Sequence, residues 1–203
     1  MTKDAADAAQ SFRWISKAAA QGYADAQHNL GAAYRDGLGT PVKMAEAVQW
    51  FRKAAEQDAA ASQFNLGDCY REGKGVEKSM VEAALWYRKA AEQGHQKAQF
   101  YLGLCYSNGG GVAKDYTEAV NWFRKAAEQG SAPAQTMLAC CYAEGRAVPK
   151  DLASAYAWLL LSRASGDEDA AELLKQVGST MTPEQIAQGT KLFRELESKF
   201  KEQ

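Results

Sequence analysis

Apolar residues recur along this chain at spacings of three and four residues, the pattern of a helix with one buried side. The segment 44–57 shows it clearly. Its alanine, valine, tryptophan and phenylalanine residues fill one arc of a helical wheel, and its charged residues fill the other. A second helix is expected over about residues 60–72, after a short break at Asp58. The pattern therefore predicts pairs of amphipathic helices.

The whole pattern returns every 36 residues, and the tryptophans mark it at Trp14, Trp50, Trp86, Trp122 and Trp158. A period of about 20–50 residues is typical of proteins that stack copies of one supersecondary unit. We therefore expect an all-α array of stacked antiparallel helix pairs over residues 1–178. Its units are about 4–39, 40–75, 76–111 and 112–147, with a partial unit at 148–178.

Two sets of recurring residues are expected to form the structural core. The five tryptophans recur at helical spacing with neighbouring aromatic residues, which favours core packing over an aromatic ligand site. Gly31, Gly67 and Gly103 fall inside the second helix of their pairs. Glycine costs about 1 kcal/mol relative to alanine in a helix, so its recurrence predicts that another helix approaches closely at this position.

The end of the chain differs from the repeats. Leu160 and Leu161 stand where units two to four have arginine and lysine, and they would be exposed at an open end. The segment 179–203 is expected to cover them with a capping helix. Thr182, Pro183 and Gln185 form the signal for its start, and its apolar stripe consists of Ile186, Phe193, Leu196 and Phe200.

The unit AxxWFRKAAEQGxxxAQxxLGxxYxxGxGV resembles the Sel-one-like repeat, a relative of the tetratricopeptide repeat with a longer loop. The resemblance covers about residues 4–178. It implies a right-handed α-solenoid whose concave side is lined by the first helices of the pairs, here taken as those that carry tryptophan. It also implies a scaffold or adaptor that binds a protein or peptide partner in that groove.

Variation against this constant background indicates where a partner would bind. The position before each tryptophan lies on the polar side of its helix and holds a different residue in each unit: Arg13, Gln49, Leu85, Asn121 and Ala157. We call these the reader positions. Leu85 is the large aliphatic residue among them, with Val81 beside it, and is a candidate apolar anchor. Drift of exposed residues without consequence is the alternative explanation.

Arginine recurs two residues after the tryptophan, at Arg52, Arg88 and Arg124. Such a row could hold carboxylates or phosphates of a partner. Glutamate follows each arginine after four residues, at Glu56, Glu92 and Glu128, and pairing within the helix is the favoured alternative.

Composition narrows the function further. The chain has 24 basic and 25 acidic residues, so we expect no nucleic-acid partner, and no apolar run predicts membrane insertion. Cys69, Cys105 and Cys141 share one repeat position, too far apart for disulfides. We expect a reduced, cytoplasmic monomer, or a periplasmic one if a leader has been removed. His28 and His95 lack neighbouring ligands, so no catalytic residue, metal or cofactor is predicted.

Several functions stay open beside the scaffold. Bacterial members of the resembled family include immunity proteins that neutralise secreted effectors, and a short chain made only of repeats suits that role. Cysteine-rich members suggest weak hydrolase or drug-binding activity, but this chain lacks an acid–base constellation, and we expect it not to be an enzyme. A purely structural spacer is the fourth possibility.

Overall fold

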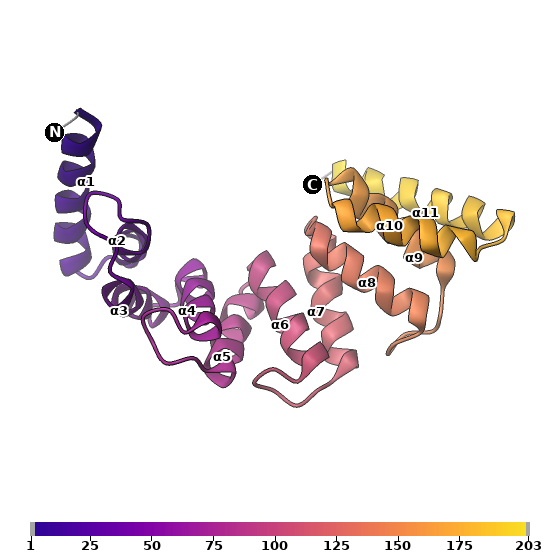
Figure 1. Cartoon of the computed structure of the whole chain (residues 1–203), viewed down its shortest axis with the longest axis horizontal. Helices are drawn as coiled ribbons and strands as arrows, with labels where there is room; N and C mark the ends of the chain where they lie inside the picture. The colour runs from indigo at the N-terminus through magenta and orange to yellow at the C-terminus, as the bar shows by residue number, and fades with distance from the viewer. Residues whose placement is uncertain (1–2, 202–203) are drawn as a thin grey trace. The chain divides into compact units, whose positions relative to one another are not determined.

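The computed structural model describes residues 3–201, which form eleven α-helices and no strands (Figure 1). The helices are α1 Lys3–Ala20, α2 Ala24–Asp36, α3 Met44–Ala55, α4 Ala60–Glu72, α5 Met80–Glu92, α6 Gln96–Asn108, α7 Tyr116–Glu128, α8 Ala132–Glu144, α9 Leu152–Ala164, α10 Glu168–Ser179 and α11 Pro183–Lys201. The predicted all-α class and the succession of helix pairs are confirmed.

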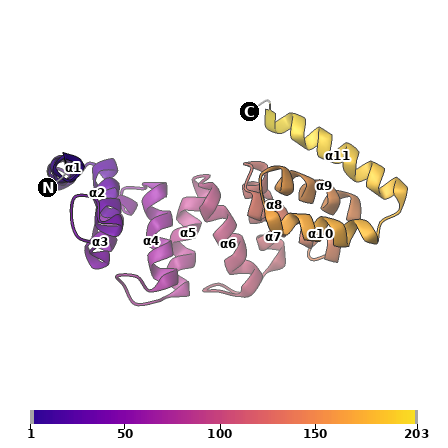
Figure 2. The same cartoon turned by 45° about the horizontal axis from the view of Figure 1, so that its top comes forward.

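The described chain divides into two compact units. One contains the residues up to Ala98 together with Gly110–Val112, and the other contains Gln99–Gly109 and the chain from Ala113 onward. Figure 2 shows the same helices in a second orientation. We call α1, α3, α5, α7 and α9 the tryptophan helices and α2, α4, α6, α8 and α10 the leucine helices, after the residue that recurs in each.

The helices begin and end where the side chains supply the missing backbone partners. At the start of α5, the Ser79 hydroxyl accepts the amide of Glu82, and at α7 the Asp115 carboxylate accepts the amide of Glu118. Gly73, at the end of α4, has a φ of 73°, a left-handed conformation that costs glycine little. Asp58, where other units have glycine, takes a φ of 61°. The helix expected after the break at Asp58 thus begins at Ala60.

The glycine inside α2, α4 and α6 makes room for an aromatic ring of the next tryptophan helix. A Cβ atom on Gly67 would lie 2.7 Å from the Tyr87 ring, and one on Gly103 would lie 2.6 Å from the Phe123 ring. Gly31 meets the ring of Phe51 in the same way. In α8 the position is occupied by Ala139, and the residue at the ring position one helix later is Leu159. Alanine is therefore tolerated where the ring is absent.

Three of the leucine helices pack more extensively against the tryptophan helix that follows them than against the one before them. This holds for α2 on α3, α4 on α5 and α8 on α9. The loop between the two helices also carries a recurring backbone bond, as in the Ser79 amide that donates to the Tyr70 carbonyl at 3.0 Å. The helices that pack most extensively are therefore a leucine helix and the tryptophan helix after it. The units predicted from the sequence instead begin with the tryptophan helix.

The tryptophans were expected to be buried in the core. This is the case for the last three, but it is wrong for Trp14. Trp86, Trp122 and Trp158 are 6%, 9% and 7% exposed, whereas Trp14 is 64% exposed; Trp50 is half-buried. Trp86 joins a cluster with Val48 of α3 and with Leu66 and Cys69 of α4. Trp14 lies in α1, the first helix of the described chain, and its ring is exposed in this structure.

The segment after α10 forms the expected capping helix. Thr182 and Gln185 exchange two hydrogen bonds, since each side chain accepts from the other's backbone amide, and Pro183 is the first helical residue. Helix α11 packs against α9. Its residues Phe193, Leu196 and Phe200 contact a cluster that includes Leu161, which is 6% exposed.

A ladder of glutamines links successive helices and was not anticipated from the sequence. The Gln63 amide donates to the carbonyl of Ala55 at 3.1 Å, and its oxygen accepts from Gln93 at 2.8 Å. Gln57 donates to Gln27 in the same way at 2.7 Å. These bonds hold polar side chains inside the stack, where an unpaired amide would be costly.

Candidate functional site

The reader positions lie at the surface in the first four tryptophan helices. Arg13, Gln49 and Asn121 are exposed, and Leu85 is 44% exposed. Ala157, at the same position in α9, is completely buried. The reader position is therefore exposed in α1, α3, α5 and α7 and buried in α9.

Helix α5 combines a fully buried face with an exposed apolar one. Ala83, Ala84 and Tyr87 are 0–1% exposed, and they fix the helix in the stack. Val81 and Leu85 lie one turn apart on the other side and are 64% and 44% exposed. Single exposed apolar residues are common on monomers, but two of them one turn apart on a rigid helix form a patch suited to contact with another protein.

The arginines that follow the tryptophans are half-buried. Arg52 donates to the hydroxyl of Tyr70, and Arg124 donates to the hydroxyl of Tyr142 at 3.3 Å. Each tyrosine belongs to the following leucine helix. The favoured pairing of Arg52 with Glu56 and of Arg124 with Glu128 is wrong, because both arginines turn toward the neighbouring helix. Arg88 occupies the same repeat position.

A row of lysines lies beside the reader positions and was missed in the sequence. Lys53, Lys89 and Lys125 place their ammonium groups 4.0, 4.3 and 4.0 Å from the ring centres of Trp50, Trp86 and Trp122. Such cation–π contacts hold the long side chains against the helix surface. The tryptophan helices therefore carry positive charge next to the reader positions. The recurrence of lysine three residues after each of the first four tryptophans was the available signal.

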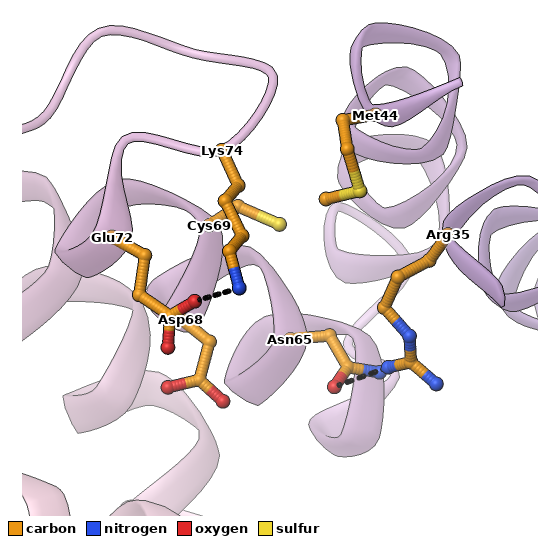
Figure 3. Close-up of a pocket in the computed structure, with 7 residues that line it drawn as sticks. All are labelled: Arg35, Met44, Asn65, Asp68, Cys69, Glu72 and Lys74. Atoms are coloured by element: carbon orange, nitrogen blue, oxygen red, sulfur yellow. Dashed lines mark hydrogen bonds and ion pairs between the residues drawn. The ribbon is translucent and has the colours of Figure 1, made fainter. Parts of the chain in front are cut away.

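A second candidate surface is a cavity of about 360 Å³ between α2 and α4 (Figure 3). Its sulfur-containing residues are Met44 and Cys69, and its polar and charged residues are Arg35, Asn65, Asp68, Glu72 and Lys74. Burial, followed by the nearby Asp68 carboxylate, raises the pKa of the Cys69 thiol to about 11. The thiol is therefore protonated at neutral pH and is a poor nucleophile.

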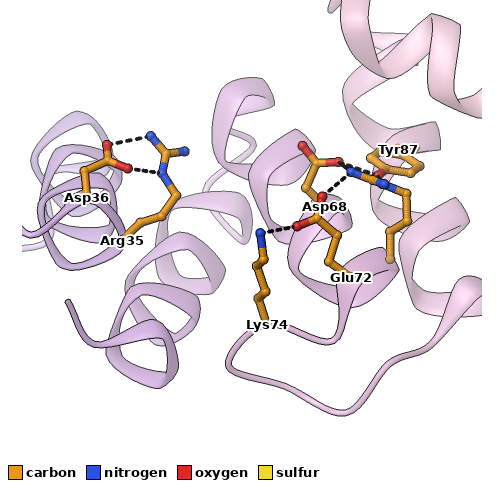
Figure 4. A network of polar contacts seen from close by, with 7 residues as sticks. Arg35, Asp36, Asp68, Glu72, Lys74 and Tyr87 are labelled. Carbon is orange, nitrogen blue, oxygen red and sulfur yellow. Dashed lines mark hydrogen bonds and ion pairs between the residues drawn. The ribbon is translucent and has the colours of Figure 1, made fainter.

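Most charges around this cavity already have partners within the chain (Figure 4). Arg35 binds Asp36 through two nitrogen–oxygen contacts of 2.7 and 2.8 Å. Lys74 lies 2.6 Å from Glu72 and holds the pKa of that carboxyl below its usual range, with Arg71 adding to the effect. Charges that neutralise one another attract a ligand weakly, so this cavity is a weaker candidate than the face of α5.

Asp68 connects α4 with α5. Its carboxylate accepts from the Tyr87 hydroxyl at 2.7 Å and from Arg71 at 3.1 Å. Burial, and then the Asp68 carboxylate, raises the pKa of Tyr87, so the phenol stays protonated. These contacts hold the Tyr87 ring of α5 against α4, the helix that contains Gly67. Asp68 therefore has a structural role.

The two histidines take part in packing. His28 shares a hydrogen bond of 2.8 Å with the Ser62 hydroxyl. His95 stacks on Phe64 with ring centres 4.9 Å apart, and its Nδ1 accepts the amide of Ala98. Within residues 3–201, no group of three or more histidine, cysteine, aspartate or glutamate side chains is arranged to hold a metal ion. Among the helices of this same stretch, none is long and apolar enough to cross a membrane.

Solved structures with similar folds are repeat proteins. The chain is 36% identical to c5321, a protective antigen of uropathogenic Escherichia coli that displays an SLR fold, with a TM-score of 0.83 over 96% of this chain. It spans 41% of the length of that antigen. A Sel1 repeat protein from Oxalobacter formigenes is 39% identical, with a TM-score of 0.77 over 91% of this chain and 76% of the other.

A third similar structure is the immunity protein Pa5087 from Pseudomonas aeruginosa. It is 25% identical, with a TM-score of 0.51 over 94% of this chain and 72% of the other. The search of curated proteins returned no match.

The family model described as Sel1 repeat matches residues 4–23, 24–58, 60–95, 96–131 and 132–167. From the second segment on, each match begins with a leucine helix and ends after the tryptophan helix that follows, in agreement with the closest packing in the structure. The family's unit thus starts one helix later than the units drawn from the sequence. The chain belongs to the Sel1 repeat family.

Proposed function

We propose that this chain is a protein-interaction scaffold that contacts its partner through the outward faces of the tryptophan helices. Sel1 repeats commonly serve as scaffolds for protein interactions. The observation that carries the proposal is the exposed pair of Val81 and Leu85 on α5, a helix whose opposite face is completely buried. The reader positions Arg13 and Gln49 extend the proposed contact along α1 and α3 of the same unit, and Asn121 is the equivalent position in α7 of the other unit.

The mechanism is non-covalent. The glycine–ring contacts, the glutamine ladder and the buried alanines hold the helix backbones, so the outward side chains are presented with little conformational freedom to lose on binding. Arg52, Arg88 and Arg124 have a supporting role in this proposal. They lie one helix turn from the reader positions, and their charge favours a partner with carboxylates.

Comparative affinity capture tests the proposal. The bait is the whole chain, and the variant carries Gln49→Glu, Leu85→Glu and Asn121→Lys. The matched control carries Asn29→Glu, Ala61→Glu and Asn108→Lys, at exposed positions of the leucine helices with the same charge changes. We expect the first variant to lose a partner that the wild type and the control retain, with equal circular dichroism spectra for all three.

Two results would contradict the assignment of the surface. Loss in the control variant alone would move the contact to the leucine helices and the cavity between α2 and α4. Equal capture by all three proteins would exclude both sets of positions. Failure to capture any partner would favour a structural spacer.

An immunity function is a second candidate, and the likeness to Pa5087 over 94% of this chain favours it. In that case the partner is a secreted effector, and the tryptophan helices are the surface that neutralises it. Co-expression with the effector encoded next to this chain would test the idea: the wild type should abolish toxicity, and the triple reader variant should not. Protection by both proteins would place neutralisation elsewhere.

A further inference from the structure

We propose that the exposed face of α5 binds an acidic amphipathic helix of a partner protein, in the way that α11 lies on α9. This inference rests on the proposed function and specifies the partner's chemistry. It comes from a difference between equivalent positions of two tryptophan helices, one of which is already covered by a helix of the same chain.

The covered case is α9. Ala153, Ala157 and Leu161 lie at every fourth position of that helix and are 3%, 0% and 6% exposed. Helix α11 packs on α9, and its apolar residues contact the cluster that contains Leu161. The face that includes the reader position of a tryptophan helix can therefore be buried by one amphipathic helix.

The approach of α11 to α9 is close. A Cβ atom on Gly189 would lie 2.9 Å from the carbonyl oxygen of Ala153 and 3.1 Å from the Tyr156 ring. Farther along, Leu196, Lys199 and Phe200 line a cavity of about 210 Å³ with Glu128 and Trp158. A helix on this face thus offers a small residue at the crossing point and large apolar residues on one side of it.

On α5 the three equivalent positions are Val81, Leu85 and Lys89, and all three are exposed. The other tryptophan helices with an exposed reader position have Ala9, Arg13 and Lys17 in α1, Ala45, Gln49 and Lys53 in α3, and Thr117, Asn121 and Lys125 in α7. Of these four helices, α5 alone has large apolar side chains at two of the positions. It is therefore the one whose face most resembles a seat for a helix.

Charge distinguishes the proposed occupant of α5 from α11. Lys89 stands where α9 has Leu161, and Arg88 stands where α9 has Leu160. Lys89 is held over the Trp86 ring at 4.3 Å, which keeps its ammonium group at the edge of the apolar patch. A partner helix that covers Val81 and Leu85 must place a carboxylate near the Lys89 ammonium group, because a cation covered without an opposite charge opposes binding. The occupant is therefore acidic beside its apolar stripe.

A defined peptide tests the proposal on the whole chain. The probe has the sequence of residues 182–201 with Lys191 and Arg194 replaced by glutamate, both exposed positions of α11, and it carries a fluorophore for anisotropy. The unmodified 182–201 peptide is the comparison. We expect the acidic peptide to bind the wild-type chain, with the unmodified peptide weaker by several-fold or more because Lys89 opposes its charge.

Variants locate the binding site. Val81→Glu with Leu85→Glu should weaken the acidic peptide by about tenfold or more. Thr117→Glu with Asn121→Glu places the same residues at the equivalent positions of α7 and should change binding by less than about twofold. Lys89→Glu should reverse the preference between the two peptides. Unchanged thermal unfolding establishes that each variant is folded.

The proposal is overturned if the acidic peptide does not bind, or if it binds equally to the α5 and α7 variants. Analytical sedimentation of the chain alone is a further test. If the chain forms a dimer that the α5 variant abolishes, a second copy of the chain binds this face and the proposed partner helix is wrong. If capture in the preceding experiment still depends on the reader positions while the peptide fails, the scaffold function stands and the helical partner is wrong.

Discussion

Trp14 and Trp86 are the same residue at the same position of two repeats, yet one is 64% exposed and the other 6%. Both lie in amphipathic helices of similar sequence. The difference lies in the surroundings of the two rings. Trp86 packs in one cluster with Val48 of α3 and Leu66 of α4, whereas Trp14 lies in α1 and its ring is not among the buried residues of the described chain. In a stacked repeat, burial of a side chain is therefore a property of the neighbouring unit.

The same contrast appears at the reader positions. Leu85 is exposed in α5, and Ala157 is buried in α9 by α11. One sequence position serves as a surface in one repeat and as core in another. Each prediction below starts from a position that differs from its equivalent in another repeat.

The largest effect is expected from the tryptophans. Trp86→Ala should lower the free energy of unfolding by about 3–5 kcal/mol, because it leaves a cavity between α3, α4 and α5. Trp14→Ala should cost less than about 1 kcal/mol, as for an exposed residue. Urea unfolding followed by circular dichroism measures both. Equal losses would mean that Trp14 is covered in solution and that the comparison fails.

The second effect concerns the glycine–ring contact. Gly103→Ala should destabilise the chain by about 1–3 kcal/mol, because the new Cβ would lie 2.6 Å from the Phe123 ring and the core cannot expand freely. In a Phe123→Leu background, which copies the Ala139–Leu159 pair of the next repeat, the same change should be nearly neutral. A double-mutant cycle measures this coupling. Additive effects would show that the ring does not require the glycine.

The third effect concerns the end of the glutamine ladder. The Gln135 side-chain oxygen is buried without a hydrogen-bond partner in the described part of the chain. Ser165 occupies the position from which Gln93 donates to Gln63, with φ of −85° against −82°. Ser165→Gln should therefore stabilise the chain by about 0.5–1.5 kcal/mol, the usual value of one hydrogen bond.

The matched change is Gln93→Ser, which removes the donor to Gln63 and should destabilise the chain by about 1–3 kcal/mol. Thermal and urea unfolding report both variants. A destabilising Ser165→Gln would indicate that the longer side chain does not reach Gln135.

The smallest effect is a dependence on pH. Burial, with a contribution from Arg35, lowers the pKa of His28 below its usual value of about 6.5. Below that value the unfolded chain binds the proton more readily, so the stability from neutral His28 is present above pH 6.5 and is lost as the pH falls. Phe64 occupies the same position one repeat later and packs on Tyr87 as His28 packs on Phe51.

His28→Phe should therefore flatten the loss of stability between about pH 6.5 and pH 5, measured as the urea midpoint at several pH values. Asn29→Gln, at the exposed adjacent position, is the control and should leave the slope unchanged. An unchanged slope in His28→Phe would assign the pH dependence to other groups.

Much of the fold follows from the sequence because its causes are local. The helical pattern, the Ser79 and Asp115 caps and the left-handed backbone at Asp58 depend on residues within a few positions of one another. The close approach at Gly67 was also predicted, since glycine inside a helix needs a packing reason. For the candidate site, the exposure of Gln49 follows from its place on the polar arc.

Other features depend on residues about 18–36 positions away, and the sequence indicated them incompletely or wrongly. The partners of Arg52 were predicted on its own helix, but Tyr70 lies on the next one. The glutamine ladder and the cavity beside Cys69 join different helices and have no local signature.

The sequence by itself determined the period, the helices and their ends, and the family to which the repeat belongs. The tertiary structure decided which of the equivalent faces are covered: α11 packs on α9, where Ala157 is buried, whereas Trp14 in α1 is exposed. The physical reason is that a helix's apolar pattern says which side can be buried, whereas burial itself requires a neighbour, and the identity of that neighbour is set by contacts across the stack.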